Sequence, residues 1–173
     1  MASNNCSADR SQHFLSLLQQ CPTAAACLSG GEQCPSLRGE VKFYQTNSGV
    51  LVAAQVCGLP SPSENCCGTP FFALHIHEGN SCDGDCGDSF SGAKGHYNPC
   101  RCQHPHHAGD LPPLLGSNGY AFSVFLTDRF SVQDIIGKTV IIHRDPDDFT
   151  TQPAGNAGEK IACGVIRCRC RAQ

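Results

Sequence analysis

The chain has 173 residues, which is enough for one domain with a buried core and too few for two ordinary domains joined by a linker. Its 12 Lys and Arg residues against 15 Asp and Glu residues give a net charge of −3, which argues against a nonspecific nucleic-acid binder. No stretch approaches the roughly 18 consecutive apolar residues of a membrane span, so we expect no membrane partner.

Residues 1–35 differ from the rest of the chain, and we expect them to form an N-terminal arm that is partly flexible or helical. Their cysteines are Cys6, Cys21, Cys27 and Cys34. Within this arm, the stretch Ser11 to Gln20 is predicted to be helical. A secretory signal needs a basic start and about 7–15 apolar residues, and neither is present here. We therefore expect a cytoplasmic protein, in which most cysteines stay reduced or bind metal.

Residues 36–173 are predicted to form a β domain. Strands are expected over 41–45, 50–56, 71–77, 119–127, 138–143 and 161–167. The first two form a hairpin, because Thr46-Asn47-Ser48-Gly49 supplies turn residues between alternating apolar positions. Residues 78–118 show almost no apolar periodicity and are predicted to be a long functional loop. Short strands with Gly and Pro in the turns favour an all-β antiparallel barrel or sandwich.

The histidines of this domain suggest a metal site. His75 and His77 stand two apart on one strand, so their side chains share a face. The long loop adds His96, His104, His106, His107 and Asp110, and His143 ends a later strand. A single strand histidine is more often a core or surface residue. The spacing His104-x-x-His107-x-x-Asp110 is common in zinc sites, however, and makes metal binding the preferred interpretation.

Five ordered motifs resemble the copper/zinc superoxide dismutase family, in its bacterial form, over about residues 38–167. They lie within residues 72–78, 95–99, 107–111, 136–143 and 155–166. The resemblance implies a Greek-key antiparallel β-barrel of 7–8 strands, similar to an immunoglobulin sandwich, with long metal-binding loops. The family barrel begins with a strand before the segment Gly39 to Gln45. Since no such strand is visible, either the N-terminal arm supplies it or the barrel has seven strands.

The resemblance also implies the ligands of two ions. The copper ligands are His75, His77, His96 and His143, and the zinc ligands are His96, His104, His107 and Asp110. His96 is shared by both ions. Asp147 matches the carboxylate that holds one copper ligand, His75, and one zinc ligand, His104. His106 has no counterpart in the family and is expected to be exposed, and Asp148 is expected to be a solvated loop charge.

The activity implied by the resemblance is disproportionation of superoxide to dioxygen and hydrogen peroxide. Copper alternates between Cu(II) and Cu(I), and zinc is structural. The shared His96 leaves copper on reduction, takes up a proton and delivers it to the second superoxide. Lys160 stands where the family has an arginine that guides the anion, so we expect a functional but slower enzyme. The expected partner is the superoxide anion, and the chain is a monomer or homodimer.

The cysteines are only partly explained by the resemblance. The family's internal disulfide would join Cys163 to Cys82, with Cys86 as the alternative. The pairs Cys100/Cys102 and Cys168/Cys170 either hold soft Cu(I) or are ordinary thiols or disulfides. This cysteine excess leaves open an alternative function, namely a non-enzymatic copper/zinc protein that serves as a metal buffer or a cross-linked coat component.

Overall fold

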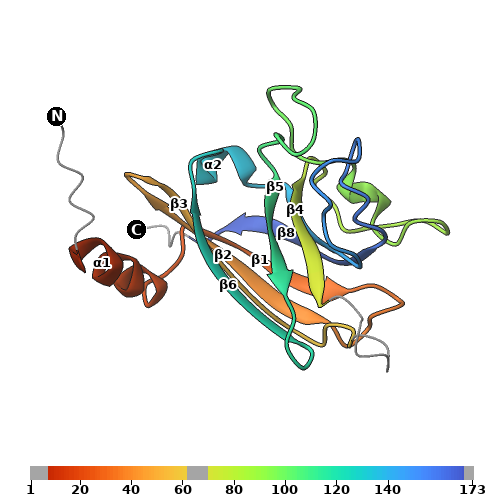
Figure 1. Ribbon diagram of the computed structural model, residues 1–173, viewed down its shortest axis with the longest axis horizontal. Helices are drawn as coiled ribbons and strands as arrows, with labels where there is room; N and C mark the ends of the chain where they lie inside the picture. Colours follow the sequence, from red (N-terminus) through yellow and green to blue (C-terminus); the bar gives the residue numbers. More distant parts are fainter. Residues whose placement is uncertain (1–7, 62–69, 170–173) are drawn as a thin grey trace.

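Eight antiparallel strands form the body of the molecule in the computed structural model, which describes residues 8–61 and 70–169. The strands are β1 (Ala24–Gly30), β2 (Arg38–Thr46), β3 (Gly49–Cys57), β4 (Phe71–His77), β5 (Asp110–Leu115), β6 (Tyr120–Thr127), β7 (Thr139–His143) and β8 (Lys160–Cys168). Their order in the sheet is β5-β4-β7-β8-β1-β2-β3-β6. The two edge strands, β5 and β6, also contact each other, so the sheet is a nearly closed barrel (Figure 1). The expected all-β Greek-key fold is confirmed.

Helical segments are few among the described residues. They are α1 (Ala8–Leu18), α2 (Val132–Ile135) and a 3₁₀ turn, η1 (Ser91–Ala93). The helix expected over residues 11–20 is present as α1, which begins three residues earlier and ends two residues earlier. No helix in the described ranges is long and apolar enough to cross a membrane.

The first barrel strand that the family resemblance implies is present as β1, which comes from the N-terminal arm. It pairs with β2 on one side and β8 on the other, in the middle of the sheet. Its residues Ala24, Ala26 and Leu28 are buried in the core. The N-terminal arm expected over residues 1–35 therefore contributes a barrel strand, and the boundary at residue 35 does not separate the strands of the sheet. Alanine has a low strand propensity, so the local sequence gave this strand no clear signal.

The prediction that residues 78–118 form one long loop is wrong in part, because residues 110–115 form strand β5. This segment contains β5 and η1, and β5 pairs with β4 through partners such as Leu74 and Leu111. Its Pro112 and Pro113 weaken the sequence signal for a strand. They are accommodated because β5 lies at the edge of the sheet, where a strand has one side without a ladder partner.

The two faces of the barrel wall have different roles. Alternation along β4 places Leu74 and Ile76 in the main core, so His75 and His77 point to the outer side. Both histidines are nevertheless buried, because the segments after β4 and after β7 cover this part of the wall (Figure 1). The fold therefore places polar chemistry outside the core and beneath long connections.

Helix α1 covers a second part of the outer wall, on β2 and β3. Phe14, Leu17 and Leu18 pack against Tyr44, Leu51 and Ala53. The N-terminal segment thus contributes apolar burial as well as a strand.

We expect Phe43→Ala to lower the free energy of unfolding of the metal-free protein by about 3–5 kcal/mol, because Phe43 is fully buried in the core. Urea unfolding followed by circular dichroism measures the change. The matched control is Phe122→Ala, whose side chain is 60 % exposed and should cost much less. Equal losses for the two variants would contradict the assigned inner and outer faces.

Candidate metal centre

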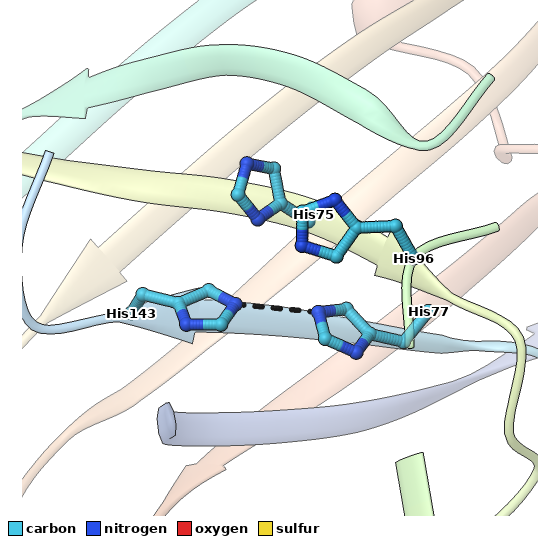
Figure 2. A group of neighbouring side chains, drawn as sticks. All are labelled: His75, His77, His96 and His143. Atoms are coloured by element: carbon cyan, nitrogen blue, oxygen red, sulfur yellow. Dashed lines mark hydrogen bonds between the residues drawn. The ribbon is translucent and has the colours of Figure 1, made fainter. Parts of the chain in front are cut away.

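Two groups of side chains bring possible ligand atoms together on the outer side of the barrel. The first is His75, His77, His96 and His143, and the second is His96, His104, His107 and Asp110. Within each group all ligand atoms lie within 4.8 Å of one another. These are the two sets expected from the sequence, and His96 belongs to both. Figure 2 shows the first group.

Three separate segments supply the first group. His75 and His77 lie at the end of β4, and His143 ends the neighbouring strand β7. His96 comes from the segment after η1, where it forms an isolated β-bridge with His77. Strand register and this bridge thus fix the four rings relative to one another.

Hydrogen bonds at the back of the rings determine which nitrogen atoms face inward. Nε2–H of His75 donates to Asp147 Oδ2 at 2.9 Å. Neutral imidazole has one N–H, so Nδ1 of His75 carries a lone pair. That Nδ1 atom is buried and has no hydrogen-bond partner. Such an orphaned acceptor is what a bound cation would satisfy.

His77 and His143 lead to the same conclusion. Nδ1–H of His77 donates to the carbonyl oxygen of Lys94 at 2.7 Å, and Nδ1–H of His143 donates to that of Gly158 at 3.1 Å. Both Nε2 atoms therefore carry lone pairs, yet they face each other at 3.2 Å (dashed line in Figure 2). Two acceptors at this distance repel unless a cation lies between or beside them.

In the second group, acceptor nitrogen atoms lie close to the carboxylate oxygens of Asp110. Nε2–H of His104 donates to Asp147 Oδ1 at 2.8 Å, which leaves its Nδ1 with a lone pair. This Nδ1 lies 3.1 Å from Asp110 Oδ2 without forming a hydrogen bond. Nδ1 of His107 is also close to this carboxylate, 3.3 Å from Oδ1. A cation bound by these atoms would remove the repulsion.

His96 connects the two groups through its opposite nitrogen atoms. Its Nδ1 is 2.7 Å from Asp110 Oδ1, within the second group. Its Nε2 is buried without a partner. Four imidazole nitrogens suit copper, and three imidazoles with one carboxylate suit tetrahedral zinc. The residues present therefore fit a copper ion and a zinc ion that share this ring.

Burial keeps the rings of His75, His77 and His143 free of extra protons. It lowers the pKa of His75, lowers that of His77 further, and lowers that of His143 to about 3, with the neighbouring imidazoles adding to the effect for each ring. The lone pairs are therefore available at neutral pH.

Asp147 is the carboxylate that joins the groups. It is buried and accepts from both His75 and His104, the two histidines expected from the sequence. Burial alone raises the pKa of Asp147, but hydrogen bonds from the two imidazoles and from a backbone N–H lower it to about 2. Gly155 (φ +67°) passes so close that a Cβ there would overlap Asp147 Oδ1. Asp148 and His106 are exposed, as expected.

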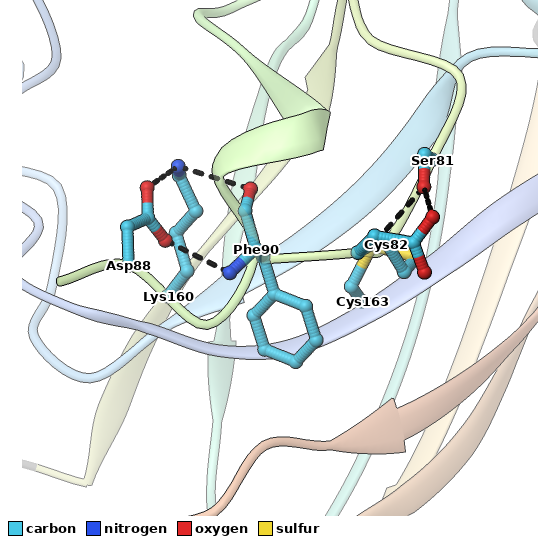
Figure 3. The surroundings of a disulfide bond; sticks show 7 residues. Ser81, Cys82, Asp88, Phe90, Lys160 and Cys163 are labelled. Carbon is cyan, nitrogen blue, oxygen red and sulfur yellow. Dashed lines mark hydrogen bonds and ion pairs between the residues drawn. A yellow bond between two sulfur atoms is a disulfide. The ribbon is translucent and has the colours of Figure 1, made fainter. Parts of the chain in front are cut away.

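Lys160 is held away from free solvent by an ion pair. Its ammonium donates to the carboxylate of Asp88 and, at 3.3 Å, to the carbonyl oxygen of Phe90 (Figure 3). Burial alone raises the pKa of Asp88, but the hydrogen bonds from Lys160 and from a backbone N–H outweigh this effect and lower it. The positive charge of Lys160 is thus largely neutralised, which residue spacing could not indicate.

A disulfide ties the segment containing Asp88 to the barrel. It joins Cys82 to Cys163 of β8, across 81 residues of sequence (Figure 3). Cys86, the alternative partner, is a free and exposed thiol. Cys100, Cys102 and Cys168 are also free and exposed, and Cys170 lies outside the described residues.

Three further residues support the site and were not anticipated from the sequence. The side chain of Gln152 binds both the N–H and the carbonyl oxygen of His104, at 3.0 and 2.6 Å. Nη1 of Arg129 donates to three backbone carbonyl oxygens in the segment that carries the second group, those of Pro105, His107 and Asp110. No spacing rule identifies such side chain-to-backbone contacts across long sequence separations.

Lys94 is the third of these residues, and its backbone is unusual. It has φ 62° and ψ −151°, a region that favours glycine and costs other residues about 1–3 kcal/mol. This conformation directs its carbonyl oxygen onto His77 Nδ1. Only its position two residues before His96 could have drawn attention to it.

Comparisons with known proteins show which family this chain resembles. The copper/zinc superoxide dismutase family model matches residues 37–166, more than half of the chain. Copper–zinc superoxide dismutase 1 of Aquifex aeolicus (strain VF5) is 35 % identical over 144 residues, which cover 75 % of this chain and 79 % of that protein. The enzyme of Legionella pneumophila is 35 % identical, covering 77 % and 80 %. Copper–zinc superoxide dismutase 3 of Arabidopsis thaliana is 32 % identical, covering 82 % and 88 %.

We expect Asp147→Asn to weaken zinc and copper affinity by about 10–100-fold, because an amide cannot accept from both rings as a carboxylate does. Competition with a chromophoric chelator measures both affinities. Asp148→Asn is the matched control, since the neighbouring carboxylate is exposed and binds only its own loop. Equal weakening by the two substitutions would show that net charge, and not ring orientation, explains the effect.

Proposed function

Because the chain belongs to the copper/zinc superoxide dismutase family, we propose that His75, His77, His96 and His143 hold the copper ion, and that His96, His104, His107 and Asp110 hold the zinc ion. The protein is an oxidoreductase that converts superoxide to dioxygen and hydrogen peroxide. The observation that carries the assignment of ligands is the convergence of buried acceptor nitrogens with no proton between them.

When bound, copper supplies the electron exchange with superoxide by alternating between Cu(II) and Cu(I), and zinc supplies a fixed positive charge that orders the covering segment. The chain determines the geometry of this chemistry. Backbone carbonyls fix the tautomers of His77 and His143, and Asp147 fixes those of His75 and His104.

His96 is proposed to be the acid of the reaction. Its Nε2 faces the first group, and its Nδ1 is held in the second group beside Asp110. Nε2 carries a proton in one half of the cycle and a lone pair in the other, and it gives that proton to an oxygen of the second superoxide. Because a second proton comes from water, two superoxide ions and two protons yield one dioxygen and one hydrogen peroxide.

Metal content together with superoxide consumption tests the proposed ligands and their role. We expect one copper and one zinc per chain, and a His96→Ala variant that loses at least about 100-fold in rate, the usual contribution of a general acid. His106→Ala is the matched control, since that ring is exposed and lies outside both groups. Metal-loaded protein that does not consume superoxide would instead support the buffer or coat function.

Lys160 is proposed to contribute weakly to substrate attraction. It lies opposite His143 in the β7–β8 ladder, but its charge is taken up by Asp88. We expect Lys160→Arg to raise kcat/KM, because the planar guanidinium keeps a free N–H edge when it pairs with a carboxylate. Pulse radiolysis of the copper-loaded variant measures this constant. An unchanged value would show that residue 160 does not act on the incoming anion.

A further inference from the structure

The cleft beside the histidines has an unfavourable charge for an anionic substrate. Its lining includes His77, His96 and His143 and the carboxylates Glu32, Asp85, Asp88 and Glu159. Only two cationic side chains, those of Lys94 and Lys160, are among the described residues that line it. An enzyme that acts on superoxide needs positive potential near the copper ligands, so the state of these two lysines matters.

The two lysines differ in whether a described carboxylate pairs with them. Lys160 is paired with Asp88 and is only 16 % exposed. Glu159 is paired with Arg144 at 3.2 Å, so it does not neutralise Lys94. Lys94 itself is exposed and has no carboxylate within ion-pair distance among the described residues. It is therefore the cation of the cleft whose charge stays available to an approaching anion.

The backbone fixes the position of Lys94 relative to the copper ligands. Its carbonyl oxygen accepts a hydrogen bond from Nδ1–H of His77, and the chain reaches His96 two residues later. A lysine stands here although the left-handed backbone, at φ 62°, favours glycine. Strained positions of this kind are concentrated at functional sites, which points to a use for the side chain.

We propose that the Lys94 ammonium attracts superoxide into the cleft and so performs the anion guidance that the resemblance assigns to position 160. This inference rests on the proposed function. A free ammonium on a flexible stem beside the ligand rings raises the local concentration of a small monovalent anion. Because the charge is exposed, its effect is screened by salt.

The first test compares kcat/KM for superoxide in copper- and zinc-loaded variants at low and high ionic strength. We expect Lys94→Gln to lower kcat/KM about two- to fivefold at low salt and to flatten its salt dependence, as loss of one guiding charge requires. Lys94→Arg should retain the wild-type value. Lys42→Gln is the control for net charge, because Lys42 lies on β2, outside the cleft, and pairs with Glu40.

A second variant separates the charge from the backbone. Lys94→Gly removes the same ammonium but relieves the left-handed strain, so it should show the rate loss of Lys94→Gln together with equal or greater stability toward urea. Azide binding, followed by the visible spectrum of the copper-loaded protein, gives a readout that does not depend on turnover. We expect azide to bind about two- to fivefold more weakly to both variants.

The outcomes distinguish this inference from the proposed function. If the wild-type protein consumes superoxide but Lys94→Gln leaves both kcat/KM and azide affinity unchanged, the role of Lys94 is wrong and the function stands. The role of Lys94 would also be wrong if Lys94→Gln lowered kcat/KM and Lys94→Gly kept the wild-type value. The backbone conformation, and not the ammonium charge, would then be the cause. If the wild-type protein binds azide through Lys94 but does not consume superoxide, the function is wrong.

Discussion

The two hydrogen bonds that Asp147 accepts are the interaction on which the metal centre depends. One carboxylate oxygen binds His75 and the other binds His104, so a single side chain sets the tautomer of one ring in each group. With their protons directed outward to Asp147, both rings present lone pairs inward. The carboxylate also couples the groups mechanically, because a shift of one ring alters the bond to the other.

The place of the centre on the barrel follows from strand geometry. Alternation along β4 assigns Leu74 and Ile76 to the core and leaves His75 and His77 on the opposite face. The barrel can therefore bury its apolar side chains without taking His75 and His77 into the core, and the covering segments bury these two rings separately. A glycine at position 155 is needed because that covering segment passes directly over Asp147.

The sequence predicted the parts of this structure that depend on local pattern. Strand β4, the hairpin β2–β3 and the pairing of His75 with His77 follow from alternation and turn residues, and the family motifs supplied the remaining ligands. Strand β1 was left as one of two alternatives and could not be located, because its alanines are buried by neighbouring strands and carry no strand signal of their own. It also lies outside the residues that match the family, 37–166. The Asp88–Lys160 pair, and the fact that no described carboxylate pairs with Lys94, depend on how distant loops fold together, which spacing alone does not encode.

Arg129 gives residues 104–110, which carry three members of the second group, a property that these three side chains alone would not provide. By donating to the carbonyl oxygens of Pro105, His107 and Asp110, its guanidinium fastens this segment to the connection between β6 and α2. Part of the ordering entropy of the segment is therefore lost during folding of the barrel and not during capture of the ion. The binding site of the apoprotein is then largely preorganised. Zinc should therefore bind with little accompanying folding of this segment.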